Sequence, residues 1–209
     1  MSIETFQIDS SNRDAFAVSG IGGGWYDERA LSSTLSVSDG QATHTSVLAY
    51  LQFKVNIPAS CHITKAKLRL WSYGNYTGNE TFKVYRAAHY TDPLWPEPAP
   101  WPLTGGSLTW NPSNWVMHHE YNTLVTEYVQ YYVNRVGYDP ATNYCCLAVG
   151  RGAYAVGNTV REIHSSTSTA AYRPKLEVTY GLSKRAHGRG GITVQGYPTA
   201  HGQPWGVGP

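Results

Sequence analysis

The chain has 209 residues, a length that suits one well-buried domain and is too short for two ordinary domains joined by a linker. Its formal net charge of +2 is too small to indicate a nucleic-acid surface, and no apolar run is long enough to cross a bilayer. The 16 tyrosines and 7 tryptophans exceed the needs of one core, which predicts aromatic rings at the surface, where they suit contacts with sugars or other proteins.

Two short strands are predicted near the N-terminus, at 3–8 (IETFQI) and 14–18 (DAFAV), with a polar turn between them. The first residues lack a cationic segment followed by an apolar run, so we expect no secretory signal. The glycine-rich stretch 20–28 (GIGGGWYDE) has neither the Lys-Ser/Thr pair nor the strand-to-helix setting of a phosphate-binding loop. We therefore predict a surface loop there.

The strongest pattern runs over 49–71 (AYLQFKVNIPASCHITKAKLRLW), which predicts two strands joined by a short turn with a proline. In the second strand, apolar residues alternate with cations: Ala66, Leu68 and Leu70 with Lys65, Lys67 and Arg69. A period of two places the cations on one face of a sheet, in water, and the apolar residues on the other. That apolar face needs a second layer, and the rest of the chain supplies mostly short strands, so we predict an all-β sandwich.

The next predicted strand is 81–88 (TFKVYRAA), with Phe82 and Val84 on one face. The segment 91–115 then holds six prolines and four tryptophans. Because proline cannot donate to a β-ladder, we expect a long irregular excursion with at most one short strand, at 107–110 (SLTW).

One helix is predicted between 122 and 136, where apolar and tyrosine residues recur every three or four positions. Its core-facing side would carry Val125, Tyr128, Val129, Tyr132 and Val136 and cover an open end of the sandwich. Strands are predicted again at 143–150 (NYCCLAVG), 158–166 (NTVREIHSS) and 173–180 (RPKLEVTY).

The three cysteines, Cys61, Cys145 and Cys146, are too few and too unevenly spaced for a disulfide framework or a zinc site. We expect reduced, partly buried thiols, with a bridge from Cys61 as the open alternative. If Cys145 and Cys146 lie on a strand, they face opposite sides, so at most one is expected in the core.

We divide the chain into a sandwich domain, 1–181, and an extended C-terminal arm, 182–209, since 181–209 holds eight glycines and three prolines and cannot bury enough surface to fold alone. The arm can pack back on its own domain or wrap a neighbouring subunit, and we favour the neighbour because such arms gain order by binding. The candidate subunit-contact residues are Lys184, Arg185, Arg189, Ile192, Val194, Tyr197 and Trp205.

The order of these features, DAFAV, LQFKVN-IP-ITKAKLRLW, FKVYRAA, LTWNP, the helix at YNTLVTEYVQYYV and a closing RPKLEVTY, resembles the DNRLRE-type domain. This family is grouped with the family ninety-six carbohydrate-binding modules, and the resemblance spans about 14–180. It implies a β-sandwich of jelly-roll type, no catalytic machinery, and a role in attachment to cell surfaces or polysaccharide.

Aromatic residues in predicted loops are the candidate carbohydrate contacts, because a ring face can stack on the apolar face of a pyranose. They are Trp95, Trp101, Trp115, Tyr73 and Tyr76. The alternatives are that prolines and tryptophans pack on each other or bury against a partner, and that the tyrosines are merely exposed turn residues.

No catalytic or metal site is predicted. His118, His119 and Glu120 are adjacent, so their side chains diverge on a strand or loop, whereas a metal needs ligands that converge from several segments. Nothing places Glu97 and Glu120 at a glycosidase separation. The loop carboxylates that could bind calcium, Asp92 and Asp139, have no ligand series around them. We expect no enzyme activity and no cofactor.

The sequence thus predicts a structural protein of a large assembly, with a bacteriophage virion as the natural setting: capsid decoration or a tail or fibre component. A β-sandwich made in the host cytoplasm without a signal reaches the outside when it is built into a particle and released on lysis. The expected partners are other virion proteins and further copies of the chain, with no nucleic acid and no membrane. The alternative is a carbohydrate-binding module, and both hold if a virion protein adheres to host glycans.

Overall fold

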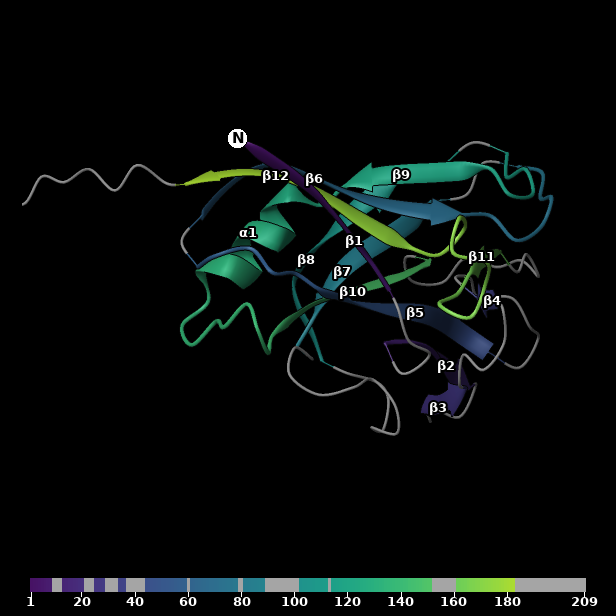
Figure 1. Ribbon diagram of the computed structural model, residues 1–209. Helices are drawn as coiled ribbons and strands as arrows, with labels where there is room; N and C mark the ends of the chain where they lie inside the picture. The colour runs from purple at the N-terminus through teal and green to yellow at the C-terminus, as the bar shows by residue number, and fades with distance from the viewer. Residues whose placement is uncertain are drawn as a thin grey trace, which may run out of the picture.

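A computed structural model describes residues 1–8, 13–20, 25–28, 34–36, 44–59, 61–78, 81–88, 102–112, 114–151 and 161–182. These residues form a sandwich of two antiparallel sheets with one helix, which confirms the predicted all-β class (Figure 1). None of the described helices is long and apolar enough to cross a membrane.

The first sheet, called sheet A, has four strands in the spatial order β1 (Ser2–Gln7), β12 (Lys175–Leu182), β6 (Cys61–Trp71) and β9 (Glu120–Leu124). Sheet B has six, in the order β3 (Trp25–Glu28), β2 (Asp14–Gly20), β5 (His44–Lys54), β10 (Tyr144–Arg151), β7 (Phe82–Ala87) and β8 (Leu103–Trp110). Two short strands, β11 (Glu162–His164) and β4 (Thr34–Ser36), pair with each other beside the sandwich.

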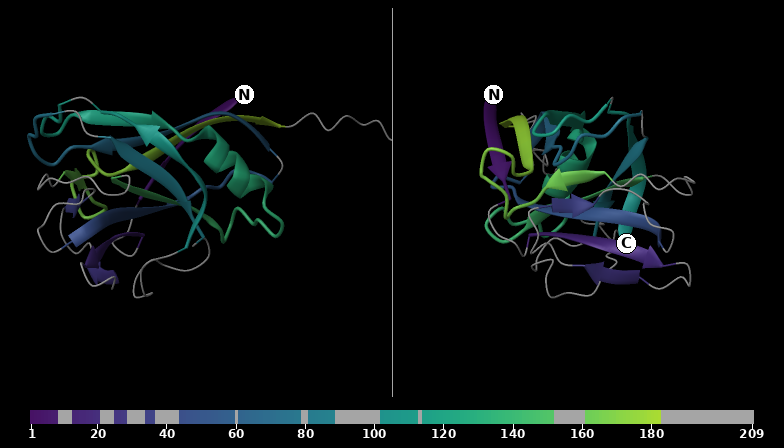
Figure 2. Two further views of the ribbon diagram at one scale, coloured as in Figure 1. Left: turned by 180° about the vertical axis from the view of Figure 1, so that it is seen from behind. Right: turned by 90° about the vertical axis from the view of Figure 1, so that its right-hand side faces the viewer.

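The connections between the sheets are those of a jelly roll. The chain crosses from β1 in sheet A to β5 in sheet B, back to β6, across to β7 and β8, and then to β9, β10 and β12 in turn. The resulting orders, β1-β12-β6-β9 facing β5-β10-β7-β8, are those of two interlocked Greek keys, and β2 and β3 extend sheet B beyond them. The two layers are visible edge-on in Figure 2.

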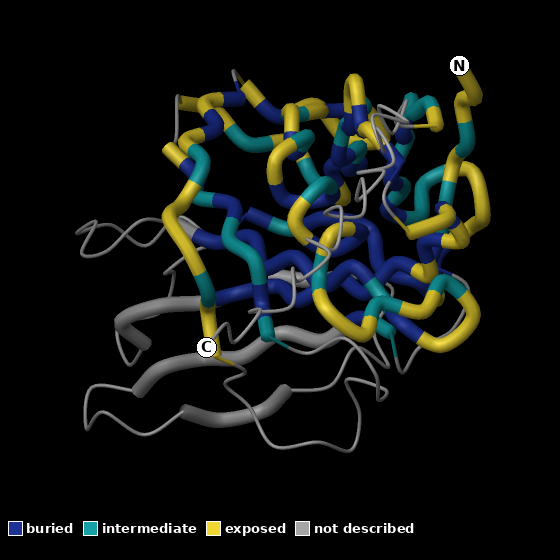
Figure 3. Tube along the Cα trace, turned by 90° about the vertical axis from the view of Figure 1, so that its left-hand side faces the viewer, coloured by how far each residue is buried: buried dark blue, intermediate teal, exposed yellow. Residues whose placement is uncertain are grey.

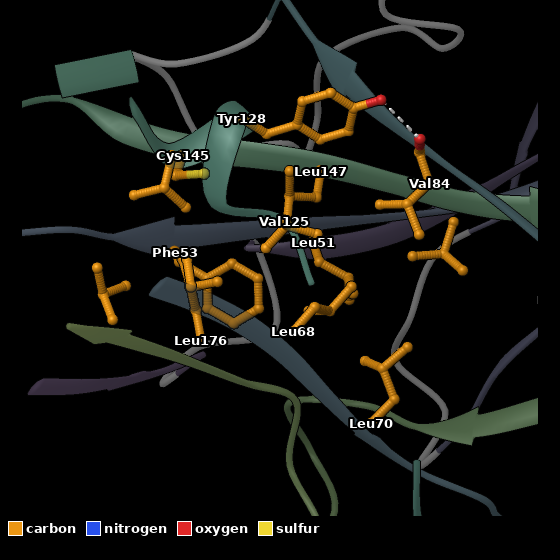
Figure 4. Packing of buried hydrophobic residues seen from close by; sticks show 14 of the residues in the cluster. Leu51, Phe53, Leu68, Leu70, Val84, Val125, Tyr128, Cys145, Leu147 and Leu176 are labelled. Carbon is orange, nitrogen blue, oxygen red and sulfur yellow. Dashed lines mark hydrogen bonds between the residues drawn. The ribbon is translucent and has the colours of Figure 1, made fainter. Parts of the chain in front are cut away.

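The space between the sheets holds the main core, to which both sheets contribute alternate residues. From sheet A come Leu68, Leu70 and Leu176, and from sheet B come Leu51 and Leu147, each at most 1% exposed (Figure 4). The alternation predicted for β6 is therefore confirmed: its leucines are buried, while its cations lie on the outer face of sheet A. Figure 3 shows the buried positions gathered in the interior of the molecule.

The outer face of sheet B is buried at its central strands, β5 and β10. Leu48, Tyr50, Cys146 and Ala148 form a second apolar cluster on the side of the sheet away from the main core. The adjacent cysteines face opposite sides of β10, as predicted, with Cys145 in the main core. The expectation that at most one would be in a core did not anticipate this second cluster, in which Cys146 is also fully buried. Both thiols are unbridged, and burial raises their pKa above the ordinary value.

The helix α1 (Thr126–Asn134) is shorter than predicted at both ends. The chain before it is paired as β9, and Val136, which was expected to face the core, is 99% exposed after the helix has ended. The remaining buried face is as expected, with Tyr128, Val129 and Tyr132 packed in the core. Periodicity overestimated the length because β9 leads almost directly into a helix with its own apolar face, and no local period marks the boundary.

Side-chain hydrogen bonds tie α1 to both sheets. The Gln130 amide accepts a hydrogen bond from Ile63 N at 2.8 Å and donates one to Cys61 O at 3.0 Å, both on β6. On the other side, the Tyr132 hydroxyl lies 2.7 Å from Ala87 O of sheet B. Burial raises the pKa of the Tyr132 phenol, so it stays a neutral donor.

Some other strands differ from their predictions, and β4 was not predicted at all. Trp25–Glu28 forms β3, where a loop was expected, and β8 begins at Leu103, four residues before the predicted SLTW strand. The difference in β8 arises because the start of this strand contains glycines, which do not resemble a regular strand in sequence. In the structure, Gly105 adopts a φ of +77° within an irregular pairing of β8 with β7.

Candidate functional site

One end of the sandwich, opposite α1 in Figure 1, is built from three segments that we call the loop end: 72–78, 114–119 and 161–174. Backbone hydrogen bonds hold the segments together. Tyr76 and Trp115 exchange two, at 2.8 and 2.9 Å, while Tyr73 N donates to Glu162 O at 2.9 Å and His118 N donates to Ser72 O at 2.8 Å. Segments far apart in sequence are thus fixed side by side.

The loop end contains three of the five aromatic residues predicted to contact sugar, and they are not equivalent. Trp115 is 2% exposed and stacks on Tyr121 with ring centroids 5.3 Å apart, so its face is not available to a ligand. Tyr76 is half-buried: its hydroxyl donates to Glu162 at 2.9 Å, and the Arg161 guanidinium lies 5.0 Å from its ring centroid. Tyr73 is 37% exposed and remains a candidate contact.

The remaining two predicted tryptophans, Trp95 and Trp101, lie outside the described residues, as do Asp92 and Glu97. The same is true of the seven residues predicted to make subunit contacts in the arm, since the described chain ends at Leu182. Asp139, the other calcium candidate, instead accepts hydrogen bonds from Ala141 N and the Thr142 hydroxyl within its own turn, at 2.9 and 3.0 Å.

A pair of histidines at the loop end was not anticipated from the sequence. His118 Nδ1 and His164 Nε2 are 2.9 Å apart and share a hydrogen bond, and His164 Nδ1 lies 2.9 Å from the Ser168 hydroxyl. The Tyr172 ring stacks on His118 with centroids 4.5 Å apart, and the Tyr73 ring meets His164 edge-on at 5.1 Å. These residues form an aromatic cluster of Tyr73, His118, His164 and Tyr172.

The backbone at His118 is unusual, because it has a φ of 61°, a left-handed conformation that residues with a side chain rarely adopt. His118 N is bonded to Ser72 O, and this turn directs the ring onto His164 and Tyr172. No sequence signal could have revealed the pairing, because His118 and His164 are separated by 46 positions and share no motif.

The three adjacent residues His118, His119 and Glu120 diverge, as predicted. His119 packs edge-on against Tyr121 at 5.0 Å, and Glu120 binds Arg69 on sheet A. Among the described residues, no group of three or more His, Cys, Asp or Glu side chains is arranged to hold a metal ion.

Burial controls the charge of the ionisable groups near this end. Desolvation, with a smaller contribution from His118, lowers the pKa of His164 to about 4, so its ring is neutral at neutral pH. Asp14, at the start of β2, accepts hydrogen bonds from the backbone and hydroxyl of Ser166, and desolvation nonetheless raises its pKa to about 6. His164 is 5% exposed, and both of its ring nitrogens are hydrogen-bonded inside the cluster, so it positions the neighbouring rings.

A second surface is the outer face of sheet A, where charges are paired with one another. Arg69 Nη2 lies 2.6 Å from Glu120, and its Nη1 lies 3.3 Å from Glu177, which also pairs with Lys67 at 3.4 Å. The hydrogen bond from Arg69 lowers the pKa of Glu120. The cations predicted on this face are therefore largely neutralised across the strands.

The margin of sheet A formed by β1 is open. β1 pairs with β12 on one side, and none of the described strands pairs with its other side, which Figure 2 shows at the edge of the sandwich. Its sequence, SIETFQ, contains no lysine, proline or glycine. Ile3 on this strand and Met1 just before it expose large apolar side chains, at 70% and 96%. We call this margin the β1 edge.

Comparison with known proteins does not identify the chain: no protein-family model matches the sequence, and no curated protein is significantly similar to it. The resemblance to the DNRLRE-type domain therefore stays a prediction.

Proposed function

We propose that this chain is a non-enzymatic structural subunit of a larger protein assembly and that it joins its neighbours through the β1 edge. The observation that carries the proposal is that no described strand pairs with one side of β1, combined with the exposure of Met1 and Ile3. A strand edge with unpaired N–H and C=O groups is a template for another strand.

Monomeric proteins normally protect such edges with lysine, proline, bulges or shortened strands. The edge strand β8 of sheet B follows this rule: it pairs irregularly with β7 and contains Gly105 at positive φ, with the Arg86 guanidinium against that glycine. β1 has no lysine, proline or glycine over its six residues, and its one charged side chain, Glu4, accepts a hydrogen bond from the Tyr180 hydroxyl of the neighbouring strand β12. The contrast with β8 favours β1 as the strand that contacts a neighbouring subunit.

A virus particle remains the setting that we propose for the assembly. The jelly-roll order of the strands supports it by fold-level analogy, since this architecture is common in viral capsid proteins. Lectins share the architecture, so the analogy also supports the alternative of a glycan-binding module.

The proposal is tested by the molar mass of the purified full chain, measured by light scattering over a range of protein concentrations. We expect the wild type to associate and Ile3→Lys to reduce association at least tenfold, because a lysine on the outer side of β1 opposes strand pairing. The matched control is Leu124→Lys, which changes an exposed leucine on β9, the opposite margin of the same sheet. A monomeric wild type, or equal effects of the two lysines, would contradict the proposal.

Carbohydrate binding at the aromatic cluster is the second candidate function. It is favoured by the exposed ring of Tyr73, which is held edge-on against His164 in a pre-formed arrangement of three segments. On a glycan array, Tyr73→Ala should abolish binding while Tyr131→Ala, which alters an exposed tyrosine on α1, should not. Equal binding by both variants and the wild type would exclude this site.

A further inference from the structure

We infer that the partner of the β1 edge is the β1 edge of a second copy of this chain, paired antiparallel with Thr5 facing Thr5 across a twofold axis. The inference rests on the proposed function and specifies the partner and the register of its contact. It extends sheet A continuously from one subunit into the next.

The first step is the direction of the β1 side chains. Phe6 packs against the main core and Ile8 is 1% exposed, so even-numbered residues face inward. Ile3 and Thr5 are exposed on the outer face. A twofold axis perpendicular to the sheet keeps the outer faces of both copies on the same side, which requires odd residues to oppose odd residues and even to oppose even.

The second step is the direction of the backbone groups. Ile8 N donates to Pro174 O, so the even-numbered residues of β1 are the ones hydrogen-bonded toward β12. Because these directions alternate along a strand, the N–H and C=O groups of Ile3, Thr5 and Gln7 point to the open side. These three alternate residues thus present backbone donors and acceptors with which another strand can pair.

The third step is the register. Two even registers each pair five of the six residues of β1 with β1 of the other copy, one centred on Glu4 and one centred on Thr5. Centring on Glu4 places the two Glu4 side chains directly opposite each other, which is unfavourable for like charges. Centring on Thr5 instead sets Glu4 opposite Phe6 and Ile3 opposite Gln7, and it forms a Thr–Thr pair, which is a favourable cross-strand pair.

The inference is tested by disulfide formation in a Thr5→Cys variant of the full chain. Directly opposite residues of a hydrogen-bonded antiparallel pair have Cα atoms about 5.5 Å apart, within the range that a disulfide spans. The three native cysteines are buried, so they do not compete. Under mild oxidation we expect Thr5→Cys to form a reducible covalent dimer on non-reducing gels.

Two matched variants on the same strand report the register. Glu4→Cys should cross-link efficiently only in the competing register, and Gln7→Cys should not cross-link to itself, because the two positions would lie four residues apart, about 13 Å. We expect both to react at least tenfold more slowly than Thr5→Cys. Equal rates for the three variants, or the fastest reaction for Glu4→Cys, would overturn the inference.

Light scattering on the reduced proteins separates this inference from the proposed function. If the wild type associates but Thr5→Cys forms no covalent dimer, the inferred pairing is wrong while the assembly role stands. If the wild type is monomeric and no variant cross-links, both are wrong. Circular dichroism of each variant shows whether it is folded, and Gln7→Ser is the non-thiol counterpart of the register control.

Discussion

Sheets A and B differ on their outer faces. Sheet A presents Lys67 and Arg69 in pairs with Glu120 and Glu177, all partly exposed, whereas sheet B buries a second apolar cluster around Tyr50 and Cys146. The central strands of sheet A, β6 and β12, therefore alternate between apolar and polar or charged residues, while β5 and β10 bury apolar residues on both faces. From this difference we infer that the buried outer face of sheet B stabilises the fold, and that the outer face and edge of sheet A are accessible for contacts with other proteins.

The largest expected effect comes from placing a charge on the outer face of sheet B. Ala148 is fully buried in the second cluster, so Ala148→Asp should lower the free energy of unfolding by about 4 kcal/mol or more, since it buries an unpaired carboxylate. Urea titration measures this. The matched change on sheet A, Thr179→Asp, faces Lys65 and should stay within about 0.5 kcal/mol. Similar losses for both would remove the distinction between the faces.

The next effect concerns the buried His164, in contrast with the exposed ion pairs of sheet A. Its folded-state pKa of about 4 lies below the ordinary 6.5, so the stability that the neutral ring contributes is complete above about pH 6.5 and is lost as the pH falls toward 4. Relative to His164→Gln, the wild type should lose up to about 3 kcal/mol over this window. Parallel pH profiles of unfolding would contradict the prediction.

Asp14 provides the control of opposite sign in the same experiment. Its pKa is raised from 3.8 to about 6, so its favourable contribution is present below about pH 4 and is lost as the pH rises through 6. Relative to Asp14→Asn, the wild type should therefore become less stable with rising pH. If the free energy of unfolding depended on pH with the same sign in both comparisons, burial would not control the pKa values of His164 and Asp14.

A smaller effect is expected where α1 reaches sheet B. Tyr132→Phe removes the donor to Ala87 O and leaves a buried carbonyl without it, which should cost about 1–3 kcal/mol. Its neighbour Tyr131 is 42% exposed, so Tyr131→Phe should be close to neutral. Thermal unfolding of the two variants distinguishes them, and an unchanged melting temperature for Tyr132→Phe would be evidence against the helix anchor.

The smallest effect belongs to the ion pairs of sheet A. Glu177→Gln breaks the contacts to Lys67 and Arg69, but these groups are partly exposed, so the loss should not exceed about 1 kcal/mol. It should shrink further in about 1 M salt, where the screening length is only a few ångströms. A larger, salt-independent loss would mean that the outer face of sheet A is as important for stability as that of sheet B.

Much of the sandwich could be predicted because its signals are local. The alternation in β6 and β12 correctly indicated which side of sheet A faces the core, and Phe82 and Val84 were placed on the buried side of β7. Of the candidate carbohydrate contacts, Tyr73 is accessible, whereas Trp115 is in the core. Composition cannot distinguish a tryptophan in a loop from one that closes the end of a core.

The sequence by itself determined the strand pattern, the solvent-exposed face of sheet A and the buried face of α1, because side-chain direction along a strand or helix depends on neighbouring residues. Only the tertiary structure decided that β5 and β10 of sheet B are buried on both faces, that His118 meets His164, and that none of the described strands pairs with the second side of β1. These features depend on which distant segments of the chain lie side by side. The spacing of residues within one segment carries no information about its distant neighbours.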